Sequence, residues 1–185
     1  MESKLQIISG KYRGRKLSLP ASARPTQNRA RIALFNMLES NIVENTNNLV
    51  VWDAFAGSGA FGIECISRYG ATAIFTDISP ESIATIHKNI NAISTENTTK
   101  IIQSDAISVI PQYAKSSNIV FVDAPYDMAE IGRAFVNKLG RAVTPDTIVI
   151  WEQEANNAVE PNADTWEILR DKIYGRARFL ILRKK

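Results

Sequence analysis

The chain has 185 residues, of which 45% are hydrophobic and 22% are charged, and its formal net charge is +3. These values are typical of one globular domain, and they exclude an intrinsically disordered chain, a collagen-like repeat and a disulfide-rich scaffold. The single cysteine, Cys65, excludes an internal disulfide and a cysteine-based zinc cluster, and no apolar run approaches the roughly 20 residues of a membrane helix, so we expect a cytoplasmic protein without a metal or a membrane partner.

The first 40 residues predict a small extension, formed by a hairpin and a helix. Two β-like segments, 5–9 and 15–19, are separated by glycines and are typical of a β-hairpin. Two prolines then interrupt the chain. Thr26 fits the N-cap of a helix, in which Ile32 and Phe35 occupy apolar positions.

From residue 49 onward, strands and helices alternate. We expect strands at 49–55, 72–76, 101–102, 119–122 and 147–151, and helices at 60–69, 80–93, 106–114 and 131–139. This alternation predicts a parallel sheet that is covered by helices on both faces. Segments 166–173 and 177–182 are typical of an antiparallel strand pair. The sequence therefore predicts one doubly wound α/β domain, residues 41–185, which follows the extension of residues 1–40.

The charged residues are distributed unevenly along the chain. The net charge is +7 over residues 1–31, −10 over residues 32–169 and +6 over residues 170–185. Two basic ends that fold onto one side of a domain form a positive face suited to a polyanion. Tyr12 and Phe179 lie in strand-like patterns within these ends, which favours a folded nucleic-acid surface over solvated tails.

A glycine-rich loop, Asp53-Ala-Phe-Ala-Gly-Ser-Gly-Ala-Phe-Gly62, follows the first expected strand and opens a helix. Glycines allow a tight turn and a close approach of the backbone to a ligand, and the helix N-terminus supplies N–H donors. The loop also fits the dinucleotide fingerprint, because Asp77 stands 20 residues beyond Gly57. By itself it does not separate an NAD enzyme from an S-adenosylmethionine enzyme.

A carboxylate ends each of the first three expected strands, at Asp53, Asp77 and Asp105. Ligands of open α/β sheets bind beyond the carboxyl ends of the strands. There Asp53 can receive an ammonium group, Asp77 ribose hydroxyls and Asp105 the amino group of adenine, which favours S-adenosylmethionine. The predicted cofactor-binding residues are Asp53, Phe55, Gly57, Ser58, Gly59, Asp77, Ile78, Asp105 and Ala106.

The fourth expected strand ends in Asp123-Ala-Pro-Tyr126, and this tetrapeptide indicates the reaction. An exocyclic base amine is a poor nucleophile because its lone pair is delocalised into the ring. A carboxylate and a backbone carbonyl that accept its N–H bonds can direct the lone pair toward an electrophile, and an aromatic ring can stack on the extruded base. The predicted catalytic residues are Asp123 and Ala124 as acceptors, Pro125 in the turn and Tyr126 as the stacking face.

A family resemblance is carried by residues 9–15, 24–26, Arg29, Arg31, 33–38, 53–62, Glu64, 67–68, 70–71, 123–126 and 174–175. In these stretches the sequence resembles RsmD, the bacterial 16S ribosomal RNA (guanine-N2)-methyltransferase family. The resemblance implies a Rossmann-like class I methyltransferase sheet, S-adenosylmethionine as the methyl donor, and one guanine, position 966, of 16S rRNA in an assembling small ribosomal subunit as the target. We expect a monomer. The predicted RNA-binding residues are Lys11, Arg13, Arg15, Arg24, Thr26, Arg29 and Arg31.

Two positions depart from the family pattern. Ala124 stands where the family usually has the first of two prolines, which keeps the carbonyl acceptor but makes the turn less rigid. Asp77 stands where the family tends to have Glu, which shortens the reach to a ribose.

Three alternative functions are compatible with parts of the sequence. An adenine-N6 DNA or RNA methyltransferase uses a similar motif, although guanine presents N1–H and N2–H₂ side by side to a carboxylate. An NAD-binding oxidoreductase explains the glycines and Asp77 but leaves residues 123–126 without a role. A non-catalytic RNA-binding or assembly protein is suggested by Ala124.

Overall fold

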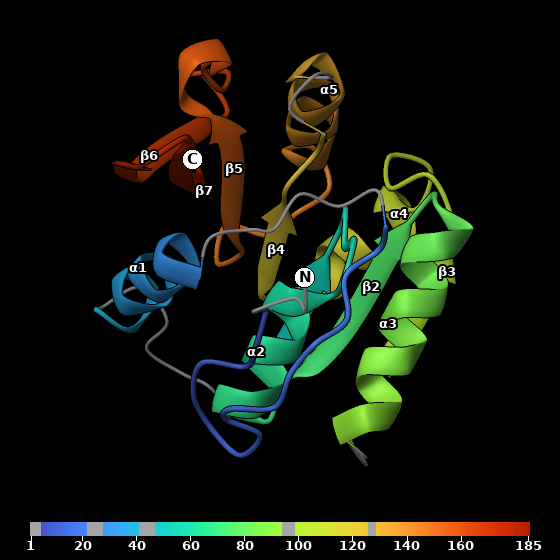
Figure 1. Cartoon of the computed structure of the whole chain (residues 1–185). Helices are drawn as coiled ribbons and strands as arrows, with labels where there is room; N and C mark the ends of the chain where they lie inside the picture. The colour runs from blue at the N-terminus through green and yellow to red at the C-terminus, as the bar shows by residue number, and fades with distance from the viewer. Residues whose placement is uncertain (1–4, 22–27, 41–46, 94–98, 126–128) are drawn as a thin grey trace.

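One seven-stranded sheet organises the fold in the computed structural model, which describes residues 5–21, 28–40, 47–93, 99–125 and 129–185 (Figure 1). The strands are β1 (Val50–Asp53), β2 (Thr72–Asp77), β3 (Thr99–Gln103), β4 (Ile119–Val122), β5 (Ile148–Glu154), β6 (Trp166–Tyr174) and β7 (Ala177–Lys184). The helices are α1 (Asn28–Glu39), α2 (Ala60–Tyr69), α3 (Pro80–Ile93), α4 (Ile110–Tyr113) and α5 (Ala129–Leu139), with 3-10 turns at Ala114–Ser116 and Ala155–Asn157.

The strand order is β3-β2-β1-β4-β5-β7-β6. Strands β1 to β5 pair in parallel, whereas β7 pairs antiparallel with both β5 and β6. The order reverses between β1 and β4, so the carboxyl ends of these two strands form the switch point at which such sheets bind ligands. The predicted doubly wound α/β sheet with an antiparallel carboxyl-terminal pair is therefore confirmed.

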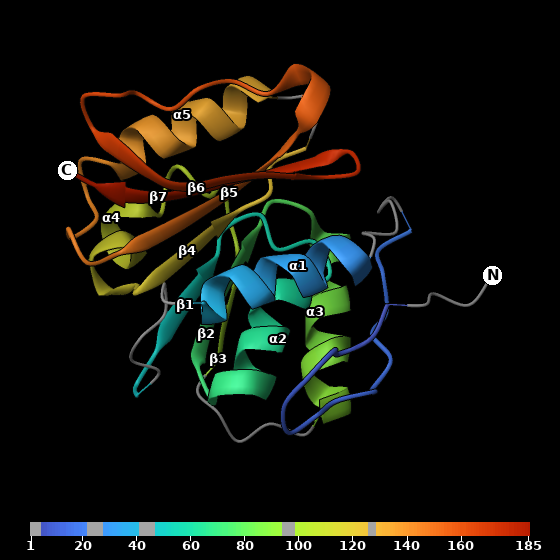
Figure 2. The same ribbon diagram turned by 90° about the vertical axis from the view of Figure 1, so that its left-hand side faces the viewer.

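Helices cover both faces of the sheet, with α1, α2 and α3 on one side and α4 and α5 on the other (Figure 2). On the first face Phe61 stacks on Phe35 of α1 and on Phe121 of β4, with ring centroids 5.3 and 4.1 Å apart. On the second face Trp52 meets Phe135 of α5 edge-on at 5.4 Å. No helix within the described ranges is long and apolar enough to span a membrane.

The predicted hairpin is present only as a chain reversal, because residues 5–19 form a single isolated β-bridge, Gln6 to Lys16. Three backbone hydrogen bonds close the reversal. Other N–H groups of the segment are taken by α2 instead: two donate to the carboxylate of Glu64 and two to Ser67. The extension therefore packs onto the α2–α3 face and has no sheet of its own in the described residues.

The predicted third helix, 106–114, is wrong in its extent. Residues 106–109 form turns, in which Asp105 accepts N–H bonds from Ile107 and Ser108, and α4 spans only Ile110–Tyr113. Pro111 lacks the N–H group that a longer helix would need at this position.

The predicted amino-terminal helix corresponds to α1, while its predicted cap, Thr26, lies outside the described residues. Phe35 is fully buried as expected, but Ile32 is 41% exposed because it lies on the solvent side of α1.

Candidate active site

The loop between β1 and α2 approaches its neighbours closely because of its glycines. Gly57 and Gly59 have φ angles of 53° and 75°, a region that glycine adopts without steric cost. A Cβ atom on Gly62 would lie 2.4 Å from the ring of Phe75, so α2 packs directly against β2. A Cβ atom on Gly57 would instead meet no described atom within 4 Å, so this side of the loop is open to a ligand.

Asp53 is the buried carboxylate at the end of β1. It is 2% exposed, and its Oδ2 accepts a hydrogen bond from the Gly62 N–H at 3.1 Å. Burial raises the pKa of Asp53 to about 8; the Gly62 hydrogen bond opposes this rise and the charge of Asp77 adds to it. A cation beside Asp53 would favour its ionised form, so the site fits an ammonium group.

Asp77 and Ile78 lie beside this loop at the end of β2. Asp77 accepts hydrogen bonds from the N–H groups of Gly57 and Ser79, both at 2.8 Å, and so ties the loop to the strand end. Ile78 is 73% exposed, which is high for a large apolar side chain and suits stacking against a nucleobase. The structure therefore brings the predicted cofactor residues of β1 and β2 together.

The remaining predicted cofactor residues differ in what they can offer. Asp105 is exposed, and its carboxylate accepts the Ile107 N–H at 3.1 Å. Ala106 is 3% exposed, so its side chain belongs to the core. Phe55 is half-buried and meets Phe135 edge-on at 5.3 Å, which fixes its ring beside the loop.

Asn89 of α3 holds the loop and the extension together, and the sequence analysis missed it. It is 2% exposed. Its Nδ2 donates to the carbonyls of Ser58 at 2.9 Å and Ser18 at 3.0 Å, and its Oδ1 accepts the Ser18 N–H at 2.8 Å. The only signal in the sequence is a polar residue at a position where α3 presents apolar neighbours to the core.

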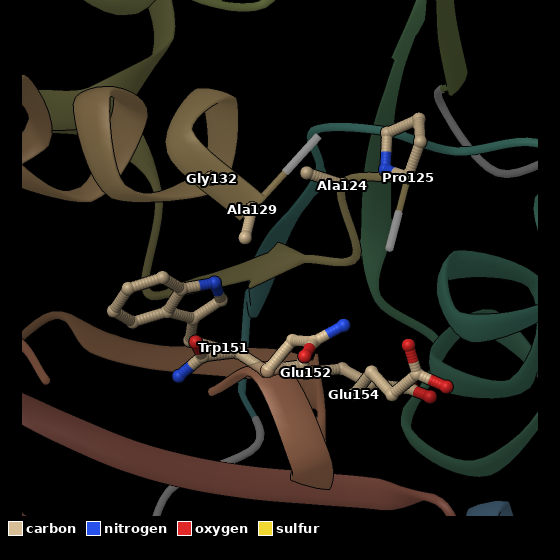
Figure 3. A pocket seen from close by; sticks show the side chains of 9 residues that line it. Ala124, Pro125, Ala129, Gly132, Trp151, Glu152 and Glu154 are labelled. Atoms are coloured by element: carbon tan, nitrogen blue, oxygen red, sulfur yellow. The ribbon is translucent and has the colours of Figure 1, made fainter. Parts of the chain in front are cut away.

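The end of β4 carries the predicted catalytic residues. Asp123 is half-buried, Ala124 is 6% exposed and Pro125 is exposed. Ala124 and Pro125 form one side of a pocket, opposite Trp151 and other residues of β5 (Figure 3). Tyr126 lies outside the described residues.

A second carboxylate that the sequence analysis missed, Glu152, lines the same pocket from β5. It is 5% exposed. Burial, and then the charges of Glu152 and Asp53, raise the pKa of Asp123 well above its usual range. The same signal that identified the other strand ends, an acidic residue directly after an apolar run, also marks Glu152.

Three of the predicted RNA-binding residues, Lys11, Arg13 and Arg15, are exposed but lie away from the carboxyl ends of the strands. The N–H of Lys11 donates to the Ser67 carbonyl at 2.8 Å, and Arg15 Nη1 donates to the Ala92 carbonyl at 2.9 Å. Both acceptors belong to the last turns of α2 and α3. Because these helices run back from the carboxyl edge of the sheet, the three cations lie toward its amino edge.

Of the remaining predicted RNA-binding residues, one is exposed, one is buried, and two lie outside the described residues. Arg29 is exposed on the first turn of α1, and Arg24 and Thr26 lie outside the described residues. Arg31 is 4% exposed; its Nη2 donates to the Gln6 carbonyl at 2.6 Å and lies 3.6 Å from Glu64 Oε2. In this structure its guanidinium therefore joins the extension to α2.

The donor set fits an S-adenosylmethionine-like ligand and does not indicate a metal. An open glycine loop and a buried carboxylate for an ammonium group lie at the switch point, and an exposed apolar side chain lies next to it at the end of β2. Within the described ranges, no group of three or more His, Cys, Asp or Glu side chains has the arrangement of a metal site.

Comparison with known proteins identifies relatives over almost the whole chain. The model of the family described as conserved hypothetical protein 95 matches residues 5–183. The Ribosomal RNA small subunit methyltransferase D of Escherichia coli (strain K12) is 31% identical over 185 residues, which cover 98% of this chain and 90% of that protein.

Solved structures share the architecture. The structure of yhhF from Escherichia coli is 30% identical with a TM-score of 0.78, and the match covers 97% of each chain. An RNA methyltransferase from Salinibacter ruber in complex with S-adenosyl-L-homocysteine is 16% identical with a TM-score of 0.62, and covers 82% of this chain and 89% of that one. The second likeness shows a common fold.

Proposed function

The chain belongs to the RsmD family, the family described as conserved hypothetical protein 95, and from this membership we propose that it methylates the exocyclic N2 amine of one guanine in the 16S rRNA of the small ribosomal subunit. S-adenosylmethionine supplies the methyl group. The relative from Escherichia coli, by its name a small-subunit ribosomal RNA methyltransferase, supports this substrate class.

The observation that carries the proposal is the position of Asp123-Ala124-Pro125 beside the glycine loop. Strand β4, which these residues follow, pairs directly with β1, and the register joins Asp53 to Phe121. The predicted amine acceptors therefore follow the strand next to the one that ends in the glycine loop. Transfer between two bound molecules requires this proximity of the two sites.

The residues of the two sites have separate roles in the proposal. Asp53 pairs with the ammonium group of the cofactor, Asp77 accepts from ribose hydroxyls, and Ile78 packs on the base. Asp123 and the Ala124 carbonyl accept the N–H bonds of the target amine, while Pro125 fixes the turn. Tyr126 provides the stacking face.

The proposed RNA contacts form two groups. Arg24, Thr26 and Arg29 belong to the segment that leads into α1 and its first turn, and we assign them to rRNA near the target base. Lys11, Arg13 and Arg15 lie toward the amino edge of the sheet, so a contact with them requires RNA that continues along α2 and α3. Such extended RNA is what an assembling subunit presents.

The test is methyl transfer from labelled S-adenosylmethionine to small ribosomal subunits that lack the modification, with naked rRNA and duplex DNA in parallel. Digestion and mass spectrometry identify the product. N2-methylguanosine in 16S rRNA supports the proposal and fixes the position, including position 966. N6-methyladenosine would move the protein to the adenine class, and cofactor binding without any product would indicate a binding or assembly role.

A further inference from the structure

Asp123 and Glu152 directly follow the last residues at which β4 and β5 pair with each other. The parallel register of β4 and β5 joins Val122 to Trp151, and each carboxylate belongs to the next residue along the chain. Neighbouring parallel strands lie about 4.8 Å apart, and residues at matching positions point to the same face. The two carboxylates therefore stand side by side at the carboxyl edge of the sheet.

Glu152 is more deeply buried than Glu154, the other acidic residue that lines this pocket. Glu152 is 5% exposed and lines the pocket together with Ala124 and Pro125, which lie across from it (Figure 3). Glu154 lines the same pocket from two residues further along β5, where it is only half-buried and forms an ion pair with Arg176. A carboxylate that is nine-tenths buried beside the predicted amine acceptors is placed to contact the base that carries the amine.

The hydrogen-bonding edge of guanine matches two adjacent carboxylates. Guanine presents its N1–H and its N2–H₂ group next to each other, so two acceptors can each take one donor. Adenine has an unprotonated N1 beside its amine, and a carboxylate at that position would face a lone pair. A site built to accept a hydrogen bond discriminates strongly against an analogue that lacks the donor.

We propose that Glu152 is a specificity-determining residue, whose carboxylate accepts the N1–H of the target guanine while Asp123 accepts from the N2 amine. This assignment rests on the proposed function, because it concerns the base that enters the same site. It adds a second acceptor, on a different strand, to the residues of the Asp123–Tyr126 motif.

The experiment compares guanosine with 2-aminopurine at the methylated position of 16S rRNA. 2-Aminopurine keeps the reacting 2-amino group but has no N1–H. The rRNA is prepared by splinted ligation and assembled into small subunits. The value of kcat/KM for methyl transfer is then measured for the wild-type protein, Glu152→Gln and the matched control Glu154→Gln.

Wild-type protein is expected to prefer guanosine about tenfold or more, the value of one hydrogen bond to a charged group. Glu152→Gln should lose most of this preference, because its amide can donate to the N1 of 2-aminopurine, and Glu154→Gln should keep it. An unchanged preference in Glu152→Gln, with N2-methylguanosine as the wild-type product, overturns this inference alone. N6-methyladenosine as the wild-type product overturns both the inference and the proposed function.

Folding of the variants is checked by their thermal shift with S-adenosylmethionine. If Glu152→Gln does not fold, Glu152→Asp takes its place, since it keeps the carboxylate but withdraws it by one methylene. The expected result is then a reduced preference for guanosine, and a preference equal to that of the wild-type protein overturns the assignment.

Discussion

Gly10 lies against the backbone of Ser67 so closely that no side chain fits between them. A Cβ atom on Gly10 would lie 1.9 Å from the carbonyl oxygen of Ser67, and the next residue donates its N–H to that same oxygen at 2.8 Å. The turn of the extension is thus fitted to the last turns of α2. Gly14 has the same φ of 82°, but a Cβ atom on Gly14 would meet no described atom within 4 Å, which makes it a natural control.

Gly10→Ala is expected to lower the free energy of unfolding by more than Gly14→Ala. Both substitutions place alanine at positive φ, which costs about 1 kcal/mol or somewhat more. Only Gly10→Ala also forces the extension away from α2, and overpacking of this kind adds about 1 to 3 kcal/mol. Urea unfolding of the two variants measures the difference, and equal losses would contradict the close approach.

Asn89→Ala is expected to weaken cofactor binding as well as stability. The substitution removes hydrogen bonds to Ser18 and Ser58, and unpaired buried polar groups cost about 1 to 3 kcal/mol. Because Ser58 belongs to the glycine loop, the affinity for S-adenosylmethionine should fall together with the stability of the protein. Calorimetric titration measures the affinity, and Asn91→Ala, at an exposed position of the same helix, is the control that should bind normally.

Asp53→Asn is expected to flatten the dependence of stability on pH. The pKa of Asp53 is raised to about 8 in the folded protein, from an ordinary value of 3.8. Between these values the folded state holds a proton that the unfolded state releases, so the free energy of unfolding falls as pH rises, by about 1.4 kcal/mol for each pH unit. The asparagine variant has no such proton.

Denaturant unfolding of the wild-type protein and Asp53→Asn at several pH values from 4 to 9 checks this prediction. If the free energy of unfolding depends on pH in the same way in both proteins, the pKa of Asp53 is not raised in the folded state. The same variant should bind S-adenosylmethionine at least about tenfold more weakly, because it loses the proposed ion pair between Asp53 and the ammonium group. In the wild-type protein, this binding should strengthen as pH rises toward 8.

Glu152→Gln is expected to move the acidic limb of the pH–rate profile to lower pH. The proposed role of Asp123 as an acceptor requires its ionised form, and burial and the charges of Glu152 and Asp53 raise its pKa. Removal of the Glu152 charge lowers that pKa, so the rate reaches its plateau at lower pH. Single-turnover rates at saturating S-adenosylmethionine measure the profile without a contribution from cofactor binding. A profile that moves equally in Glu154→Gln would argue against a specific effect of Glu152.

Reversal of charge at Arg24 and Arg29 is expected to weaken rRNA binding without an effect on the cofactor. Each lost phosphate contact reduces by about one the slope of the logarithm of the binding constant against the logarithm of the salt concentration. Filter binding of 16S rRNA at several salt concentrations measures this, and Lys115→Glu, an exposed cation beyond α4, is the matched control. A parallel loss of S-adenosylmethionine binding would instead indicate misfolding.

The sequence predicted the sheet and the strand-end carboxylates well, because both follow from local patterns. Apolar strand patterns that alternate with helical patterns predict a parallel sheet. A glycine loop after the first strand indicates where the switch point lies. The structure confirms this α/β sheet, and Asp53 and Asp77 lie where the pattern predicts.

Contacts between distant segments could not be predicted in the same way. In the sequence, Arg31 resembles a surface cation of a basic segment. In the structure its guanidinium contacts Gln6 and Glu64, which is apparent only from the packing of the extension on α2. Asn89 is similar, because its partners come from two other parts of the chain. The missed Glu152 needed no tertiary information, since in the sequence it follows an apolar run directly, as the other acids do.

The placement of β7 has a consequence for synthesis of the protein. β7 lies between β5 and β6, and it pairs Glu152 with Phe179 and Trp151 with Leu180. The strand that carries Glu152 is therefore paired on only one side while a ribosome is still translating the residues before Phe179. Because β7 follows every other strand of the described sheet along the chain, the second neighbour of β5 is the last strand to be added to the sheet.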